Sequence, residues 1–268
     1  MAVRLLAVDL DGTIIPKGRA ISSEATAVLQ ALIDSGIILV PATGRCLENV
    51  PDQILGLKGL RYVISSNGAM VMDMERGKPV HRSLIPWRQT ASMLRMLTLD
   101  DAYSCVYADN HIYNRKTLPE FMTRPDYLAG VFCKNTVDDL PRFIEERRMG
   151  AEKIFIAVWE PEIRSMLRIK LMRRPGIIIS SSSVRNLEIN RLGTDKGVAL
   201  KYLVERLGIG RSEVAAAGDN ENDLQMLRFA GTAIAPSDGM PEARAEAAVI
   251  TEPCVDDGVV KYIRRYIL

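Results

Sequence analysis

The chain has 268 residues, of which 47% are apolar and 25% charged, as in an ordinary globular protein with a substantial core. Its net charge of +2 excludes a strong global attraction to nucleic acid or anionic membranes, and no apolar run approaches the ~18 residues that span a bilayer. We therefore expect a cytoplasmic protein without nucleic-acid or membrane partners. Four scattered cysteines lack any Cys-x-x-Cys pair, which predicts reduced thiols and no zinc site: Cys46, Cys105, Cys133 and Cys254.

The first predicted element is a strand over residues 4–8 that leads directly into Asp9 and Asp11. Its nearly continuous apolar run suits a parallel strand covered on both faces. Two carboxylates side by side at a sheet edge repel each other unless they share a proton or bind a cation. Asp9 could then act as a nucleophile and Asp11 as a proton donor. The alternative is a plain turn rich in Asp and Gly.

A helix follows, capped by Ser22 or Ser23 and ended by Gly36, and further strands are predicted at residues 37–40 and 62–64. This strand, helix, strand order predicts an α/β fold with right-handed crossovers in a parallel sheet.

Polar residues follow both of these strands. Thr43 and the backbone at Gly44 could hold phosphate oxygens, and Arg45 offers a planar fork for phosphate or carboxylate. Equally, the segment could cap a helix, and Arg45 could be a surface residue. Asn67, after the third strand, could orient a nucleophile, contact substrate or form a turn.

The middle of the chain, from about residue 82 to 185, contains most of the aromatic residues and no carboxylate cluster after a strand. We interpret it as a separate α/β unit inserted into the first domain, with the aromatic residues in its core. Its predicted strands cover residues 103–107, 154–159 and 177–179, and its predicted helices cover 87–97, 137–149 and 162–172.

The C-terminal part returns to the first pattern, with a helix from about 195 to 207 and a strand over 214–217. Lys196 opens this helix, which is unfavourable for the helix dipole unless an anion lies nearby; the alternative is an exposed lysine. After the strand come Asp219, Asn222 and Asp223, a set of oxygen ligands suited to magnesium, or else an Asx-rich turn. Because ligands bind at the carboxyl ends of parallel strands, we expect these polar segments to converge on one crevice.

These residues resemble the haloacid dehalogenase superfamily of phosphatases, specifically its Cof-type branch, over essentially the whole chain. Four motifs occur in order, and a Ser66-Asn67-Gly68-Ala69 step is also typical of the branch: Asp9-x-Asp11-Gly12-Thr13, Thr43-Gly44-Arg45, Lys196 before Gly197, and Gly218-Asp219-x-x-Asn222-Asp223. The resemblance implies a Rossmann-like parallel-sheet core of residues 1–82 and 186–268. It also implies an inserted α/β cap domain of residues 83–185 that closes over the site and selects the substrate.

The resemblance further implies that Asp9 attacks phosphorus to form an aspartyl-phosphate and that Asp11 protonates the leaving group and then activates water. It implies that Mg²⁺ is held by Asp9, the Asp11 carbonyl and Asp219, supported by Asn222 and Asp223. Thr43 and Lys196 would hold the transferring phosphoryl group.

Three functions are compatible with these residues. The first is a magnesium-dependent phosphatase acting on a small phosphorylated metabolite, such as a sugar phosphate or a phosphoglycolate-like acid. The second is a sugar phosphomutase on the same scaffold. The third is a non-catalytic metabolite-binding protein, which the complete set of carboxylates disfavours because unused charges in one crevice are a cost without a benefit.

Overall fold

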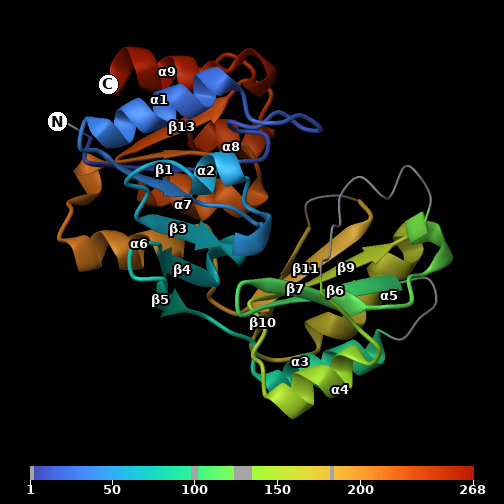
Figure 1. Ribbon diagram of the computed structural model, residues 1–268. Helices are drawn as coiled ribbons and strands as arrows, with labels where there is room; N and C mark the ends of the chain where they lie inside the picture. The colour runs from blue at the N-terminus through green and yellow to red at the C-terminus, as the bar shows by residue number, and fades with distance from the viewer. Residues whose placement is uncertain (1–2, 98–101, 124–134, 182–183) are drawn as a thin grey trace. The chain divides into compact units, whose positions relative to one another are not determined.

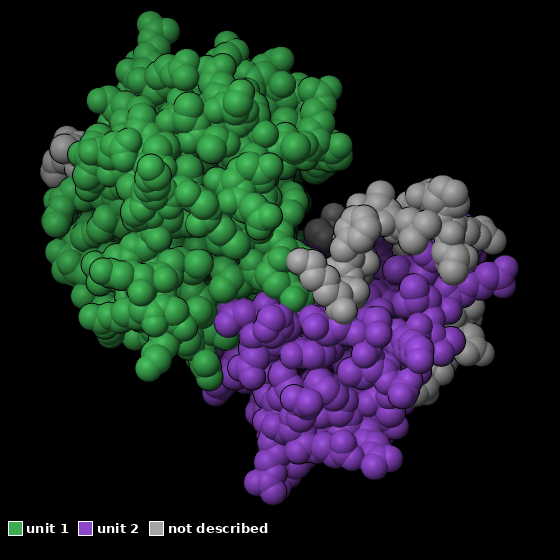
Figure 2. All heavy atoms as spheres, viewed as in Figure 1, with its two compact units in different colours: residues 1–82, 195–268 green, residues 83–194 purple. Residues whose placement is uncertain are grey.

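The computed structural model describes residues 3–97, 102–123, 135–181 and 184–268. The chain divides into two compact units, which are coloured separately in Figure 2. The first unit comprises Met1–Arg82 and Asp195–Leu268, and the second comprises Ser83–Thr194. The sequence expectation placed residues 186–194 in the first unit, whereas the structure groups them with the second. The reason is that strand β11 (Asn186–Arg191) pairs with two strands of the second unit.

The first unit is built on a five-stranded sheet in which every neighbouring pair is parallel. Its strand order is β14 (Val249–Thr251), β13 (Thr232–Pro236), β12 (Val214–Ala217), β1 (Leu5–Val8) and β2 (Ile38–Pro41). The predicted fold class, an α/β protein with a parallel-sheet core, is confirmed.

Helices cover both faces of this sheet (Figure 1). In β1, Leu6 and Val8 pack into one apolar cluster, while Leu5 and Ala7 pack into the other, because successive side chains of a strand point to opposite faces. The first cluster includes α1 (Ser23–Asp34) and α9 (Gly258–Tyr266); the second includes α6 (Lys196–Leu207), α7 (Leu224–Phe229) and α8 (Pro241–Glu246).

Local signals set the start of the helices that position the site. Ser22 is the N-cap of α1, where its hydroxyl accepts a hydrogen bond from the Ala25 amide at 2.9 Å. Asp195 caps α6 in the same way through the Val198 amide at 2.7 Å. Because Asp195 is the cap, Lys196 becomes the first residue of α6.

The third predicted strand, β3 (Tyr62–Ser65), does not continue the parallel sheet. It forms a three-stranded antiparallel sheet with β4 (Met70–Asp73) and β5 (Lys78–Arg82). A single parallel bridge, Ala42 to Ile64, connects it to the end of β2. The short turn between β3 and β4 favours hairpin pairing, and this pairing carries Asn67 to the edge where β2 ends.

The second unit contains a sheet of six described strands; among these, β7 and β8 pair in parallel and the other neighbours pair antiparallel. Helices α3 (Trp87–Met96), α4 (Leu140–Arg147) and α5 (Pro161–Met172) supply the rest of its apolar core. The strand order is β10 (Ile177–Ser180), β11, β9 (Lys153–Val158), β6 (Ala102–Ala108), β7 (His111–Arg115) and β8 (Asn135–Val137).

Two expectations concern the chain as a whole. Cys46, Cys105 and Cys254 are buried, while Cys133 lies outside the described residues. Among the helices that the structure describes, none combines the length and apolarity needed to cross a bilayer.

Candidate active site

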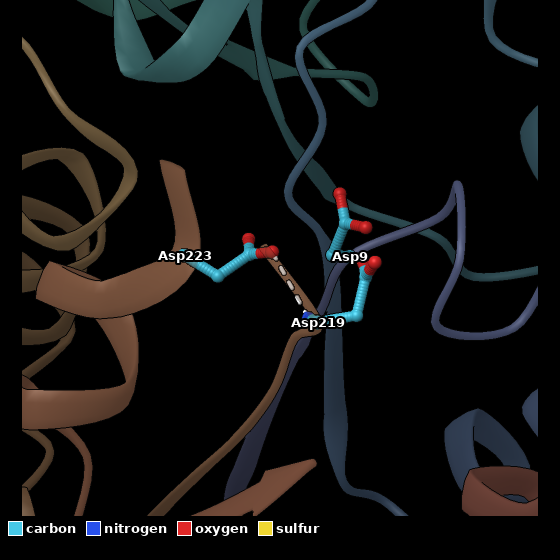
Figure 3. A group of neighbouring side chains, drawn as sticks. All are labelled: Asp9, Asp219 and Asp223. Carbon is cyan, nitrogen blue, oxygen red and sulfur yellow. Dashed lines mark hydrogen bonds between the residues drawn. The ribbon is translucent and has the colours of Figure 1, made fainter. Parts of the chain in front are cut away.

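Asp9 and Asp219 emerge side by side at one edge of the core sheet. Asp9 directly follows β1, and Asp219 lies two residues after the end of β12. These neighbouring strands pair in parallel up to Val8 and Ala217. The Asp9 amide donates to the Ala217 carbonyl at 2.9 Å, which extends this pairing to the carboxylate itself. Figure 3 shows these two side chains next to each other, with the Asp223 carboxylate directed at the Asp219 backbone. One oxygen from each of the three carboxylates lies within 4.8 Å of the others.

Lys196 lies against this carboxylate cluster and is completely buried, at 0% exposure. Its Nζ is 2.6 Å from Asp9 Oδ1 and 2.7 Å from Asp223 Oδ1. Burial alone would lower the pKa of Lys196, but the Asp223 and Asp9 carboxylates outweigh burial and raise it. The lysine therefore stays charged, and the alternative of an exposed lysine is wrong.

Asp223 has a structural role within the cluster. Its Oδ2 accepts hydrogen bonds from the backbone amides of Asp219 and Asn220, each at 3.1 Å, while its Oδ1 accepts from Lys196. Both oxygens are therefore occupied by protein donors. This leaves Asp9 and Asp219 as the carboxylates best placed to bind a cation.

Burial raises the pKa of Asp9 well above its ordinary value, and the Asp223 and Asp219 carboxylates add to the shift against the opposing effect of Lys196. Burial likewise raises the pKa of Asp219 to about 6, with the Asp223 carboxylate as the next cause. Lys196 thus does not by itself compensate the negative charge of the cluster. A hard divalent cation with oxygen ligands would compensate it, so the residues present fit a magnesium site.

Two residues of the first motif, to which the sequence reasoning assigned no role, shape the cluster. The buried Thr13 hydroxyl is 3.1 Å from Asp219 Oδ1 and 3.4 Å from Asp9 Oδ2, so it links the two carboxylates. Gly12 has φ +93°, and a Cβ there would collide with the Asp219 carboxylate. The Asp-Gly-Thr spacing was the available signal, because a turn that approaches a neighbouring strand end requires glycine.

Asp11 lies apart from the carboxylate cluster. Its side chain is 48% exposed, and its two oxygens accept from Arg45 Nη2 at 2.5 Å and Nε at 2.7 Å. Arg45 Nη1 also donates to the Asn49 carbonyl at 3.0 Å, which fixes the guanidinium. The sequence predicted that the Asp9 and Asp11 carboxylates would lie side by side; instead, a guanidinium holds the Asp11 carboxylate in a bidentate pair.

The remaining predicted residues form a second group next to the cluster. Thr43 is buried, and its hydroxyl accepts from the Arg45 amide at 3.1 Å. Asn222 Nδ2 donates to Asn67 Oδ1 at 3.1 Å. A Cβ on Gly44 would lie 2.7 Å from the same Asn67 oxygen, so the close approach predicted for this glycine is to a protein amide.

All of these residues belong to the first unit, which therefore holds every predicted site residue. A family model described as haloacid dehalogenase-like hydrolase matches residues 6–263. The chain belongs to this family, and the resemblance that the motifs predicted is confirmed.

Individual relatives match the chain over nearly its full length. It is 26% identical over 266 residues to the 5-amino-6-(5-phospho-D-ribitylamino)uracil phosphatase YcsE of Bacillus subtilis, covering 99% of this chain and 96% of that protein. It is 29% identical over 272 residues to the HMP-PP phosphatase of Serratia proteamaculans, covering 98% and 95%. The fold also matches a haloacid dehalogenase-like hydrolase from Bacteroides thetaiotaomicron, with a TM-score of 0.84 at 24% identity, covering 98% and 99%.

Proposed function

We propose that this protein is a magnesium-dependent phosphatase that hydrolyses a phosphate ester of a small metabolite through an aspartyl-phosphate on Asp9. One observation carries the proposal: Asp9 and Asp219 lie together at the carboxyl edge of the sheet, and a fully buried lysine reaches Asp9 at 2.6 Å. Asp is a known covalent nucleophile in phosphoryl transfer.

Each residue of the site then has a defined task. Asp9 forms the bond to phosphorus as the ester oxygen leaves. Asp11, in its protonated form and released from Arg45, gives that oxygen a proton. Asp11 next takes a proton from the attacking water, which breaks the bond between Asp9 and phosphorus and releases phosphate. Lys196 favours the ionised form of Asp9 and offers positive charge to the phosphoryl oxygens, where charge neutralisation supplies most of the catalysis.

Magnesium would be held by Asp9, Asp219 and the Asp11 carbonyl, with Asn222 supporting it or its waters. When bound, the ion supplies Lewis-acid stabilisation of the phosphoryl oxygens. Asp223 holds Lys196 and the Asp219 backbone in place, as its hydrogen bonds require. Thr43 and Gly44 would receive the phosphoryl group beside them.

The second unit would be the cap that excludes water and selects the substrate. The names of the relatives favour hydrolysis of a small phosphorylated compound over a mutase reaction, since one acts on a phosphoribityl-aminouracil and another is an HMP-PP phosphatase. A sugar phosphate or phosphoglycolate-like acid belongs to the same chemical class.

The test compares the wild-type chain with Asp9→Asn, using p-nitrophenyl phosphate with Mg²⁺. Asn cannot form the acyl-phosphate, so turnover should disappear while circular dichroism shows a folded protein. An acid quench with labelled substrate should leave a hydroxylamine-sensitive phosphoryl label on the wild type only. Near-wild-type turnover by the variant would remove Asp9 from the nucleophile role. In a separate assay with a sugar phosphate as substrate, accumulation of an isomeric sugar phosphate rather than free phosphate would identify a mutase.

A further inference from the structure

The segment that follows β3 has an unusual backbone. Ser66, Asn67 and Gly68 all have positive φ, at 53°, 59° and 92°, and all three are buried. Serine rarely adopts this left-handed conformation. The Ser65 hydroxyl beside them is buried and has no hydrogen-bond partner among the described residues. Such strain persists where the surroundings over-determine it, most often at functional sites.

Backbone contacts hold this segment against two other loops of the site. The Ser66 amide donates to the Arg45 carbonyl at 2.8 Å, and the Asn67 amide donates to the Thr43 carbonyl at 3.1 Å. On the other side, a Cβ at Gly68 would collide with the carbonyl of Asp195, the residue that caps the helix of Lys196. The strained conformation is therefore fixed between the loop after β2 and the start of α6.

The Asn67 side chain makes the contact to the third loop. Its Oδ1 accepts from Asn222 Nδ2 at 3.1 Å, which fixes the orientation of the Asn222 amide. With Nδ2 directed at Asn67, the carbonyl oxygen of Asn222 is the atom that remains for a hard cation or its bound water. The same Asn67 oxygen lies against Gly44, where a side chain would displace it.

We infer that Asn67 is a positioning residue, and that its left-handed backbone aims an amide oxygen at Asn222 so that Asn222 presents its own carbonyl oxygen to the magnesium site. This inference rests on the proposed function. Asn67 would act through Asn222 and not through the phosphoryl group. Loss of a residue that hydrogen-bonds to a metal ligand and orients it typically lowers metal affinity about 10–100-fold.

The experiment measures Mg²⁺ binding by calorimetry on metal-free protein in a double-mutant cycle. Asn67→Gly removes the amide but tolerates the positive φ, so the variant should fold and melt close to the wild type. Its Mg²⁺ affinity should fall about 10–100-fold. Asn222→Ala should lose a similar factor, and the double variant should be no weaker than Asn222→Ala alone.

Activity gives a second readout. With p-nitrophenyl phosphate, Asn67→Gly should lower kcat at limiting Mg²⁺, with KM for the ester little changed, and excess Mg²⁺ should restore most of it. Unchanged Mg²⁺ affinity in Asn67→Gly, or a full additional loss from it in the Asn222→Ala background, would overturn the positioning role. If the wild type binds Mg²⁺ and turns over, such a result removes only this inference. If the wild type does neither, the proposed function fails as well.

Discussion

Replacing Lys196 with Met tests the charge balance of the site most directly. The substitution keeps an apolar chain of similar length but removes the cation that contacts Asp9 and Asp223 at 2.6 and 2.7 Å. Removing one partner of a buried ion pair costs about 3–5 kcal/mol, because it leaves buried charge uncompensated. At about 2–4 °C per kcal/mol for a domain of this size, Tm should fall by roughly 6–20 °C in EDTA.

Differential scanning calorimetry is the assay, with Lys201→Met as the matched control. Lys201 lies on the same helix, but its side chain is 60% exposed, so its loss should change stability by no more than about 0.5 kcal/mol. Calorimetry is preferred to tryptophan fluorescence, because both tryptophans, Trp87 and Trp159, lie in the second unit and would report the unfolding of that unit rather than of the mutated one.

Added Mg²⁺ should raise the Tm of the Lys196→Met protein more than that of the wild type, since the ion then supplies the only compensating charge. Activity toward p-nitrophenyl phosphate should drop about 10²–10³-fold at saturating Mg²⁺. A Lys196→Met protein that melts in EDTA within about 2 °C of the Lys201→Met control would refute the reasoning, given the expected 6 °C minimum.

Three further predictions concern the same site. The folded-state pKa of Asp219, about 6, exceeds its ordinary value of 3.8, so the metal-free protein should lose stability as pH rises from about 4 to about 6. Because Mg²⁺ must displace this proton, the Mg²⁺ affinity measured by calorimetric titration should fall about tenfold for each pH unit below 6. A pH-independent Mg²⁺ affinity would contradict the assignment of Asp219 as a ligand. Gly12→Ala should cost about 1–3 kcal/mol and weaken Mg²⁺ binding. Gly18 also has a positive φ, of +73°, but a Cβ there would meet nothing within 4 Å, so Gly18→Ala should leave Mg²⁺ binding intact. Equal Mg²⁺ affinities in the two variants would exclude the close approach to Asp219 as the cause. Asp11→Asn should lower kcat about 10²–10⁴-fold for an alkyl phosphate but much less for p-nitrophenyl phosphate, whose leaving group needs little protonation; equal losses on both esters would argue against Asp11 as the acid.

The sequence alone predicted much of the frame of the site. Apolar strands at residues 4–8 and 214–217 end in Asp9 and Asp219, and parallel strands present their carboxyl ends at one edge. The cap of the first helix was also readable, because an N-cap bond depends on residues three positions apart. Signals of this kind are local, or follow from sheet geometry that the strand pattern already defines.

The sequence did not predict how β3 pairs. Its apolar run is compatible with a parallel or an antiparallel neighbour, and in the structure β3 pairs antiparallel with β4 in a hairpin. The sequence also predicted that the second unit ends at residue 185, before β11, whereas in the structure it ends at Thr194. Strand β11 belongs to the second unit because it pairs with β9 and β10, and its own polar sequence does not reveal this pairing. Strand pairing is a property of segments that meet in space, so one segment cannot reveal it.

Tertiary structure decided the charges of the site. Lys196 could have been an exposed helix residue, and only packing buries it against Asp9, 187 positions away, and Asp223, 27 positions away. The pairing of Asp11 with Arg45, 34 positions away, is likewise invisible in the motif that contains it. Residue types and their spacing determine which chemistry is available, but solvent exclusion and the choice of ionic partner depend on the surfaces that folding brings together.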